Sequence, residues 1–314
     1  LMKNGFSFDA RFSKVNSDGY VERAFSDLYS YYASGAWYGM NTMVKLMAFG
    51  GGEKTYMAWD GIDSTTLADN RRYNPAGHYI DDDGNDAFYD NQTDNYRQNH
   101  FQLHASHIFN ARWNLNAALH YTYGNGYYEQ YKENRKFAEY GLPNFIDSLG
   151  NCIKKSDIVR RKNLKNHFYG GVLAVNYTHR KVNASLGGAV NNYQGDHFGN
   201  VIWVRTYNQS IPQDFEYYRS QGNKFEANVY LKADWQIIKG LNLFGDLQYR
   251  YINYQIEGIN DENLEEIPVH EQFHFFNPKA GISYTNSGHT AYFNFAIANR
   301  EPNRQNYTEA GPND

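Results

Sequence analysis

The clearest pattern in the chain is an unbroken alternation of apolar and polar residues from Phe225 to Ile237. Successive side chains of a β-strand point to opposite faces, so this stretch predicts a strand with one apolar and one polar face. Lys239 and Gly240 predict a tight turn, and the alternation resumes after it as far as Ile256. Both arms of this hairpin exceed the usual strand length of about five or six residues. Its polar face carries charges of both signs, namely Glu226, Lys232, Asp234, Asp246 and Arg250.

The same alternation predicts strands on both sides of the hairpin. They cover residues 5–12, 24–38, 43–58, 101–109, 115–123, 169–177, 182–190, 273–284 and 290–298, so that about eleven strands are expected.

The connections between these strands alternate in length from Gly39 to the end of the chain. The short ones lie at 39–42, 110–113, 179–181, 239–240 and 286–288, and the long ones cover 59–95, 134–162, 194–223 and 257–272. Outer-membrane barrels have short periplasmic turns and long extracellular loops. A Greek-key sandwich would need crossover connections within that order. We therefore predict an all-β fold, an antiparallel up-and-down transmembrane β-barrel segment that forms roughly half of a large barrel.

Composition agrees with this prediction. The 314 residues include 29 Tyr, 20 Phe and 27 Gly, yet only 41% are hydrophobic. A membrane barrel combines these properties because only every second strand residue meets lipid. A soluble β-sandwich is the alternative that composition alone leaves open. Charges on the polar strand faces favour a wet or plugged lumen, since a small packed interior would leave them unpaired.

Several other classes are disfavoured. The net charge of −4 argues against a nucleic-acid partner. The single cysteine, Cys152, allows no disulfide framework and no cysteine metal site. No apolar run is long enough for a transmembrane helix. We find no nucleophile elbow, Walker loop or zinc-protease helix, so neither an enzyme nor a cofactor is expected.

One proline tests the strand assignment. Six of the seven prolines fall in predicted loops, whereas Pro278 falls inside a predicted strand. Because proline removes a donor from the hydrogen-bonded ladder, we predict a bulge or a strand end at this residue.

Two groups of residues could bind a metal ion. Residues 81–86 (DDDGND) could hold calcium. A loop turn with Gly84 or Asn85 at positive φ is the simpler interpretation, and Gln92 stands where an EF-hand needs an acidic residue. His100 and His104 share a strand face while His107 lies on the other, which argues against a metal-binding trio. Of the other candidates, His270 and His274 are expected to face the lumen or an interface, and His289 to belong to a turn.

A basic cluster and several tryptophans are further candidates. The cluster comprises Lys154, Lys155, Arg160, Arg161 and Lys162, and it could meet an iron chelate or lipopolysaccharide phosphate, or form a solvated loop. We expect the five tryptophans at membrane interfaces, namely Trp37, Trp59, Trp113, Trp203 and Trp235, although Trp59 at a loop entrance could stack on a ligand.

Particular segments also resemble a known family. Residues 275–281 (FFNPKAG), followed by 298–304 (ANREPNR), resemble the barrel of TonB-dependent outer-membrane receptors. Residues 17–20 (SDGY), 88–96 (FYDNQTDNY) and 126–131 (GYYEQY) are similar to segments of the same family. These segments occur in barrel order across almost the whole chain.

The resemblance implies a barrel of about 22 strands with an N-terminal plug domain inside it. It also implies a location in the outer membrane of a Gram-negative bacterium, among lipid and lipopolysaccharide. Such receptors bind a scarce nutrient at their extracellular loops and draw energy from the TonB complex. An iron–siderophore, haem, cobalamin or an oligosaccharide would be the nutrient, and no individual ligand-binding residue is assigned.

Residues 1–314 are expected to be a partial barrel domain, without the plug, the TonB box or the closing strand. A passive porin and a structural or adhesive barrel without TonB coupling are the alternatives.

Overall fold

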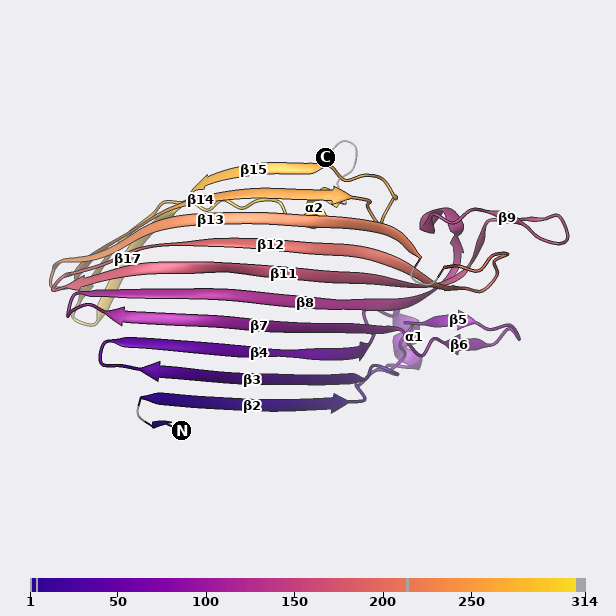
Figure 1. Cartoon of the computed structure of the whole chain (residues 1–314), viewed down its shortest axis with the longest axis horizontal. Coiled ribbons are helices and arrows are strands. Elements are labelled where there is room, and N and C mark those ends of the chain that lie inside the picture. Colours follow the sequence, from indigo (N-terminus) through magenta and orange to yellow (C-terminus); the bar gives the residue numbers. More distant parts are fainter. Residues whose placement is uncertain (1, 4, 213–214, 309–314) are drawn as a thin grey trace.

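The backbone forms one large antiparallel sheet that curls along its length (Figure 1). A computed structural model describes residues 2–3, 5–212 and 215–308. Neighbouring strands of the sheet follow the order of the chain, so each long strand pairs with the ones before and after it. The antiparallel up-and-down arrangement predicted from the alternation of loop lengths is therefore confirmed.

The sheet contains most of the regular structure. Its strands are β1 (Met2–Lys3), β2 (Phe6–Ser17), β3 (Ser26–Tyr38), β4 (Thr42–Tyr56), β7 (Thr93–Ile108), β8 (Trp113–Lys136), β11 (Lys155–His179), β12 (Val182–Val204), β13 (Glu216–Ile238), β14 (Leu241–Gly258), β15 (Val269–Phe276), β16 (Lys279–Asn286) and β17 (His289–Ala296). Two small hairpins pair β5 (His78–Ile80) with β6 (Asp86–Phe88), and β9 (Phe145–Ile146) with β10 (Cys152–Ile153). The short helices are α1 (Ser64–Asp69), the 3-10 helix η1 (Phe137–Tyr140) and α2 (Arg304–Thr308).

Short turns and long loops lie at opposite ends of the strands. The turns gather at the left of Figure 1, and the loops with their small hairpins project at the right. Both β15 and β16 pair with β14, the first at its loop end and the second at its turn end. They are halves of one strand interrupted at Asn277 and Pro278, which confirms the strand break predicted there. Counted in this way, the described residues make eleven long crossings.

The strands extend further toward the loops than the hydrophobic pattern predicts. For example, β8 continues to Lys136 and β11 starts at Lys155, although both ends were assigned to a loop. The backbone ladder continues there, with Tyr128 opposite Lys162 and one register shift between Ser156 and Ile158. Apolar and polar residues alternate only in the part of a strand where one face contacts an apolar environment. Beyond that part both faces meet polar surroundings, so the pattern disappears while the hydrogen bonds persist.

The outer face of the sheet is apolar over its middle. Leu46, Leu103 and Leu119 lie in one cross-strand row, and Leu186, Leu231 and Leu247 lie in another. These side chains are exposed, at 40–60% of their maximal accessible surface. An apolar surface this extensive marks contact with lipid or another partner. The apolar face of the β13–β14 hairpin thus belongs to the lipid-facing outer surface, and its charged face lies on the concave side of the sheet.

Tryptophans mark the turn-end border of the apolar band. Trp37, Trp113 and Trp235 lie on the outer face near the short turns, as expected for an interfacial belt. The expectation for Trp203 is wrong. It lies near the end of β12 among the loops and contacts the ring of Tyr131, with centroids 6.1 Å apart.

Within the described residues, neither α-helix is long and apolar enough to cross a bilayer.

Neighbouring residues on β13 provide a test of the two faces. We expect Leu231→Arg to lower the free energy of unfolding by about 2–4 kcal/mol in a bilayer, since it places a charge in lipid. Lys232→Ala, on the opposite face, should have little effect. Denaturant titration of the protein in phospholipid vesicles measures both values. Equal losses for the two variants would contradict a lipid-facing outer wall.

Candidate functional site

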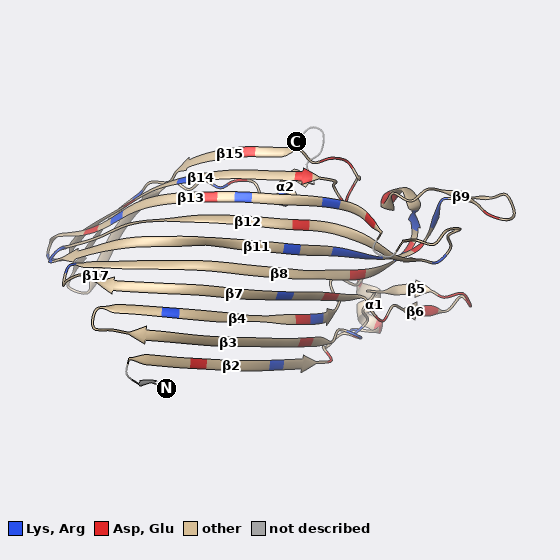
Figure 2. Ribbon diagram, in the orientation of Figure 1, with Lys and Arg blue, Asp and Glu red and all other residues tan. Residues whose placement is uncertain are grey.

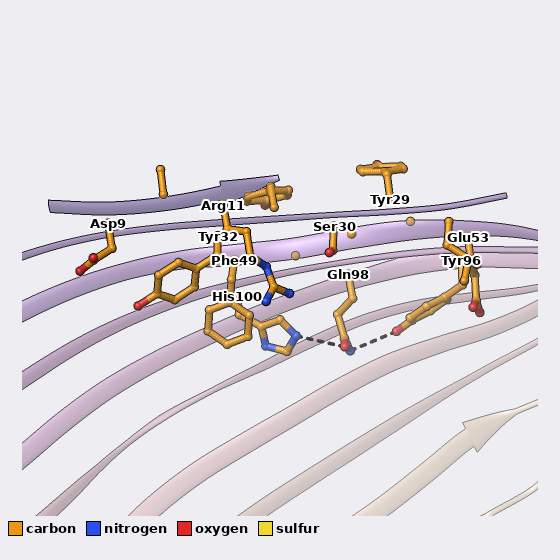
Figure 3. Close-up of a pocket in the computed structure, with 16 residues that line it drawn as sticks. Asp9, Arg11, Tyr29, Ser30, Tyr32, Phe49, Glu53, Tyr96, Gln98 and His100 are labelled. Atoms are coloured by element: carbon orange, nitrogen blue, oxygen red, sulfur yellow. Dashed lines mark hydrogen bonds between the residues drawn. The ribbon is translucent and has the colours of Figure 1, made fainter. Parts of the chain in front are cut away.

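The concave face carries a row of stacked side chains near the first strands (Figure 3). Arg11, Tyr32, Phe49 and His100 are direct cross-strand partners on β2, β3, β4 and β7. The rings of Phe49 and His100 stack with centroids 4.6 Å apart and planes 10° apart. All four extend from the same side of the ribbons in Figure 3, whereas Tyr29 lies on the other side. A groove of about 920 Å³ runs along this row.

The histidine in this row is held by hydrogen bonds. His100 Nδ1 lies 2.9 Å from Thr122 Oγ1, and Nε2 lies 3.1 Å from Gln98 Oε1. Gln98 in turn donates to the hydroxyl of Tyr96 over 3.3 Å. Both ring nitrogens of His100 are therefore engaged, and the groove is a polar and aromatic surface.

The other candidate histidines lie on strands, and several contact a neighbouring side chain. His104 shares the concave face with His100, while His107 lies on the outer face and contacts Thr42. His270 contacts Gln255 and His274 contacts Tyr249, each across a strand pair. His289 directly follows the last turn. Among the described residues, no group of three or more His, Cys, Asp and Glu side chains could hold a metal ion.

Residues 81–86 form a turn at the tip of the β5–β6 hairpin. The Asp81 Oδ1 atom accepts from the backbone amides of Asp83 and Asn85, at 3.0 and 2.8 Å. These bonds lower the pKa of Asp81, with the amide of Asn85 as the largest cause. Gly84 has φ 83°, as the simpler interpretation predicted. The side chain of Gln92 is buried elsewhere, where it accepts from the amide of Tyr131. These contacts give the calcium hypothesis no support.

The basic cluster is divided between the two faces of β11. Arg160 and Lys162 point into the curl, where Arg160 donates to Gln130 and Lys162 pairs with Asp261. Arg161 points outward, pairs with Glu129 and lies over the ring of Tyr127 at 4.4 Å. The expectation of a solvated loop is wrong for residues 155–162, because they belong to the strand and alternate with it.

The long loops are tied to the strand ends by buried polar contacts. Glu129 is only 2% exposed and accepts hydrogen bonds from Tyr89, Asn91 and Arg161. Burial, followed by the neighbouring carboxylate of Glu129, raises the pKa of the Tyr89 hydroxyl. The ends of β8 and β11 are themselves joined by a hydrogen bond of 2.7 Å from Tyr131 to Asp157. The loops therefore form a fixed rim around the loop end of the sheet.

A buried apolar cluster supports this rim. Helix η1 contributes Phe137 and Tyr140, which pack against Ile158, Val201 and Tyr217 of the strand ends. All five side chains are at most 8% exposed. The main core of the described chain thus lies under the loops and not within the lipid-facing part of the wall.

The last described segment returns across the concave face. Glu301 pairs with Lys224 and with Arg250, and Arg250 also binds Glu226 through two hydrogen bonds of 2.7 and 2.9 Å. Arg304 donates to Ser220 over 2.7 Å, and the ring of Tyr307 contacts Tyr254. We call residues 297–308 the strap. It covers β13 and β14, and it supplies a carboxylate partner for Lys224 and Arg250 of the charged concave face.

Wall, loops and strap together enclose a vestibule at the loop end of the concave face. Its volume is about 380 Å³, and its lining includes Glu53, Asp94, Tyr128, Lys162, Asp261 and Arg304. Trp59 lies beside it, with its ring edge-on to Tyr128 and centroids 5.5 Å apart. Trp59 lies at a loop entrance, as expected from the sequence. The strap could not be predicted, because residues 299–308 have no strand or helix periodicity.

Comparison with known proteins identifies the family of the β-barrel that contains this vestibule. Residues 47–313 match the family model described as TonB dependent receptor-like, beta-barrel. The chain belongs to the TonB-dependent receptor family. The receptors are outer-membrane proteins of Gram-negative bacteria, as the resemblance implied. The family consists of transporters rather than enzymes, which agrees with the expectation that the chain is not an enzyme.

Solved receptor structures share the fold at low sequence identity. The ferric-catecholate import receptor Fiu from E. coli K12, in its open form, is 11% identical with a TM-score of 0.65, and the match covers 96% of this chain and 51% of Fiu. The ferric citrate transporter FecA is 10% identical with a TM-score of 0.64, covering 93% of this chain and 39% of FecA. The copper transporter OprC is 12% identical with a TM-score of 0.60, covering 95% and 41%.

The chain therefore spans about half of these receptors or less. A comparison with curated protein sequences gives no match.

The strap provides a test of the concave-face charges. Glu301 is 9% exposed, so Glu301→Gln removes a charge from a shielded ion-pair network. We expect the free energy of local opening of the strap to fall by about 1–3 kcal/mol. Hydrogen–deuterium exchange of residues 297–308 in the full-length receptor measures this change.

Glu271→Gln is the matched control, because Glu271 is an exposed carboxylate on the neighbouring strand β15. Unchanged exchange in the Glu301 variant would show that these ion pairs do not hold the strap.

Proposed function

We propose that the protein imports a scarce nutrient across the outer membrane with energy from the TonB complex. Family membership supports the class of activity. The vestibule supports the place of binding, since its rim is built from the long loops and lies at the end of the barrel that faces the outside. The fixed loops would present a preformed site, as is usual for small-molecule pockets.

Charges in the loop half of the concave face favour an anionic nutrient. Lys132, Arg160 and Lys162 lie on the same face of adjacent strands, where Ile158 is the cross-strand partner of Lys132. Only Lys162 has a carboxylate partner among the described residues, namely Asp261. Lys162 lines the vestibule together with Arg304, and Lys132 and Arg160 extend the positive charge toward the loops, with Arg160 donating to Gln130. Charge-assisted bonds are stronger in such partly shielded surroundings than in open water. This group of cations is the observation that carries the proposal.

An iron chelate is the anionic nutrient we propose first. A ferric-catecholate import receptor and a ferric citrate transporter are among the structurally similar proteins, and both are named for an iron chelate. Haem, cobalamin and an oligosaccharide are the further candidates. Tyr128 and Trp59 would offer ring faces to any of these ligands.

Uptake in cells distinguishes this function from its alternatives. The full-length gene should restore growth on a ferric chelate as sole iron source in a strain lacking its own receptors. Growth should stop when TonB is deleted. Growth that persists without TonB would indicate a passive porin, and no uptake of any candidate would favour a structural or adhesive barrel.

One variant tests the cation group directly. Lys132→Gln should weaken binding of an anionic chelate roughly tenfold, about 1.4 kcal/mol, because it removes one charge-assisted contact. Isothermal titration of the full-length receptor measures the dissociation constant. Lys45→Gln is the matched control, since Lys45 lies on the same concave face near the turn end. Equal binding by both variants and the parent protein would place the ligand elsewhere.

A further inference from the structure

The outer face carries a second group of cations, separate from the vestibule. Lys14, Arg97 and Lys165 lie in one cross-strand row that passes through Tyr29, Gly52 and Asn125. Lys54 lies two residues beyond Gly52 on β4 and therefore points to the same face. In Figure 2 the blue segments of β2, β4, β7 and β11 lie at nearly the same level along the strands.

This row lies where the apolar band ends and the loops begin. On the turn side of it, the outer face presents the aromatic residues Phe12, Tyr31, Tyr121, Tyr123 and Tyr169. Aromatic belts mark the level of the lipid headgroups. The cations just beyond the belt therefore lie at the depth of headgroup phosphates in the outer leaflet.

A hollow in the sheet surface is lined by Lys14, Lys54 and Arg97, and Lys165 lies next to it as the cross-strand partner of Asn125. Its volume is about 460 Å³, and its lining includes Lys14, Tyr29, Lys54, Arg97, Asn125 and Tyr127. Gly52 forms part of its lining, and the ring of Tyr29 lies so close that a Cβ there would come within 2.7 Å of it. The missing side chain at Gly52 lets the aromatic ring lie flat and leaves room above the strand.

On the outer face the hollow has three cations, Lys14, Lys54 and Arg97, against one carboxylate, Asp27, which lies opposite Lys54 in the strand register. Lys14 forms an ion pair with Asp27. Lys54, Arg97 and Lys165 are exposed and have no carboxylate partner among the described residues. Glu53 belongs to the lining but points to the concave face, because it alternates with Lys54. The site offers several donors and one planar guanidinium, which is the chemistry that binds phosphate oxygens.

We propose that Lys54, Arg97 and Lys165 bind the phosphate groups of lipopolysaccharide in the outer leaflet. The sugar phosphates of this lipid lie at the depth of the hollow, and its acyl chains would lie along the apolar band below. Lys14, tethered by Asp27, lines the edge of the site. Arg161 is not part of it, since Glu129 already neutralises that side chain.

Binding of purified lipid A to the full-length receptor in detergent micelles tests the site. A variant with Lys54→Gln, Arg97→Gln and Lys165→Gln should bind diphosphoryl lipid A about 10–100-fold more weakly than the parent protein. Dephosphorylated lipid A should bind weakly to both proteins. Raising the ionic strength should reduce the difference between them, because exposed charges are screened.

The matched control removes three cations outside the hollow, with Lys45→Gln, Lys232→Gln and Lys239→Gln. It should bind diphosphoryl lipid A as the parent protein does, and an unchanged shift in electrophoretic mobility on heating verifies that both variants are folded. Equal lipid binding by the parent protein and the hollow variant would overturn the proposal. Complete displacement of lipid A by millimolar inorganic phosphate would overturn the lipid assignment in favour of a free anion. Chelate uptake by the hollow variant should be normal, so failure of this proposal and failure of the proposed transport function are distinguishable.

Discussion

The structure depends on the need to pair every backbone amide and carbonyl of a strand that crosses lipid. No water is available in the hydrocarbon layer, so an open or irregular segment there would leave several kcal/mol of unsatisfied hydrogen bonding per group. An antiparallel ladder meets this need when each strand runs from turn to loop, and at the break between β15 and β16 the amide of Asn277 still donates to the carbonyl of Gln248 over 2.9 Å. Side chains must then alternate between lipid and lumen. The period-two pattern, the exposed leucines and the charged concave face all follow from that one requirement.

The energetic consequence of this arrangement is that charged side chains on the concave face are partly shielded from water. A wall that is apolar outside is polar inside, and charges such as Glu226 and Arg250 are partly shielded from water. They persist because each finds a partner, within β13 and β14 or on the strap through Glu301. Asp246 is similarly close to Lys279 of the next strand. The strap is thus a consequence of the same alternation, as it neutralises a face that the fold obliges to be polar.

Much of the fold could be predicted from the sequence because lipid imposes a simple pattern. The strand order, the positions of the short turns and the break at Pro278 all follow from local residue types. The loop half of each strand could not be predicted, since Lys155 to Lys162 and Tyr127 to Lys136 have no hydrophobic period once both faces meet polar groups. Their pairing is set by register, which is inherited from the membrane part of the same strands. The division of the basic cluster between two faces follows directly from that register, but only after residues 155–162 are known to be strand.

The candidate sites were harder to predict because each combines distant segments. The vestibule joins Glu53, Tyr128 and Asp261 with Arg304, and no local motif connects them. Similarly, the outer hollow is recognisable only when Lys54, Arg97 and Lys165 are placed on adjacent strands in register. The two sites lie on opposite faces of β7, β8 and β11, one strand thickness apart. Neighbouring residues of a regular strand point to opposite faces. A substitution that changes a charge on one face therefore leaves the side chains of the other face unaltered. Lipid contacts and ligand contacts can therefore be altered independently on the same strands, while the backbone ladder between them stays fixed.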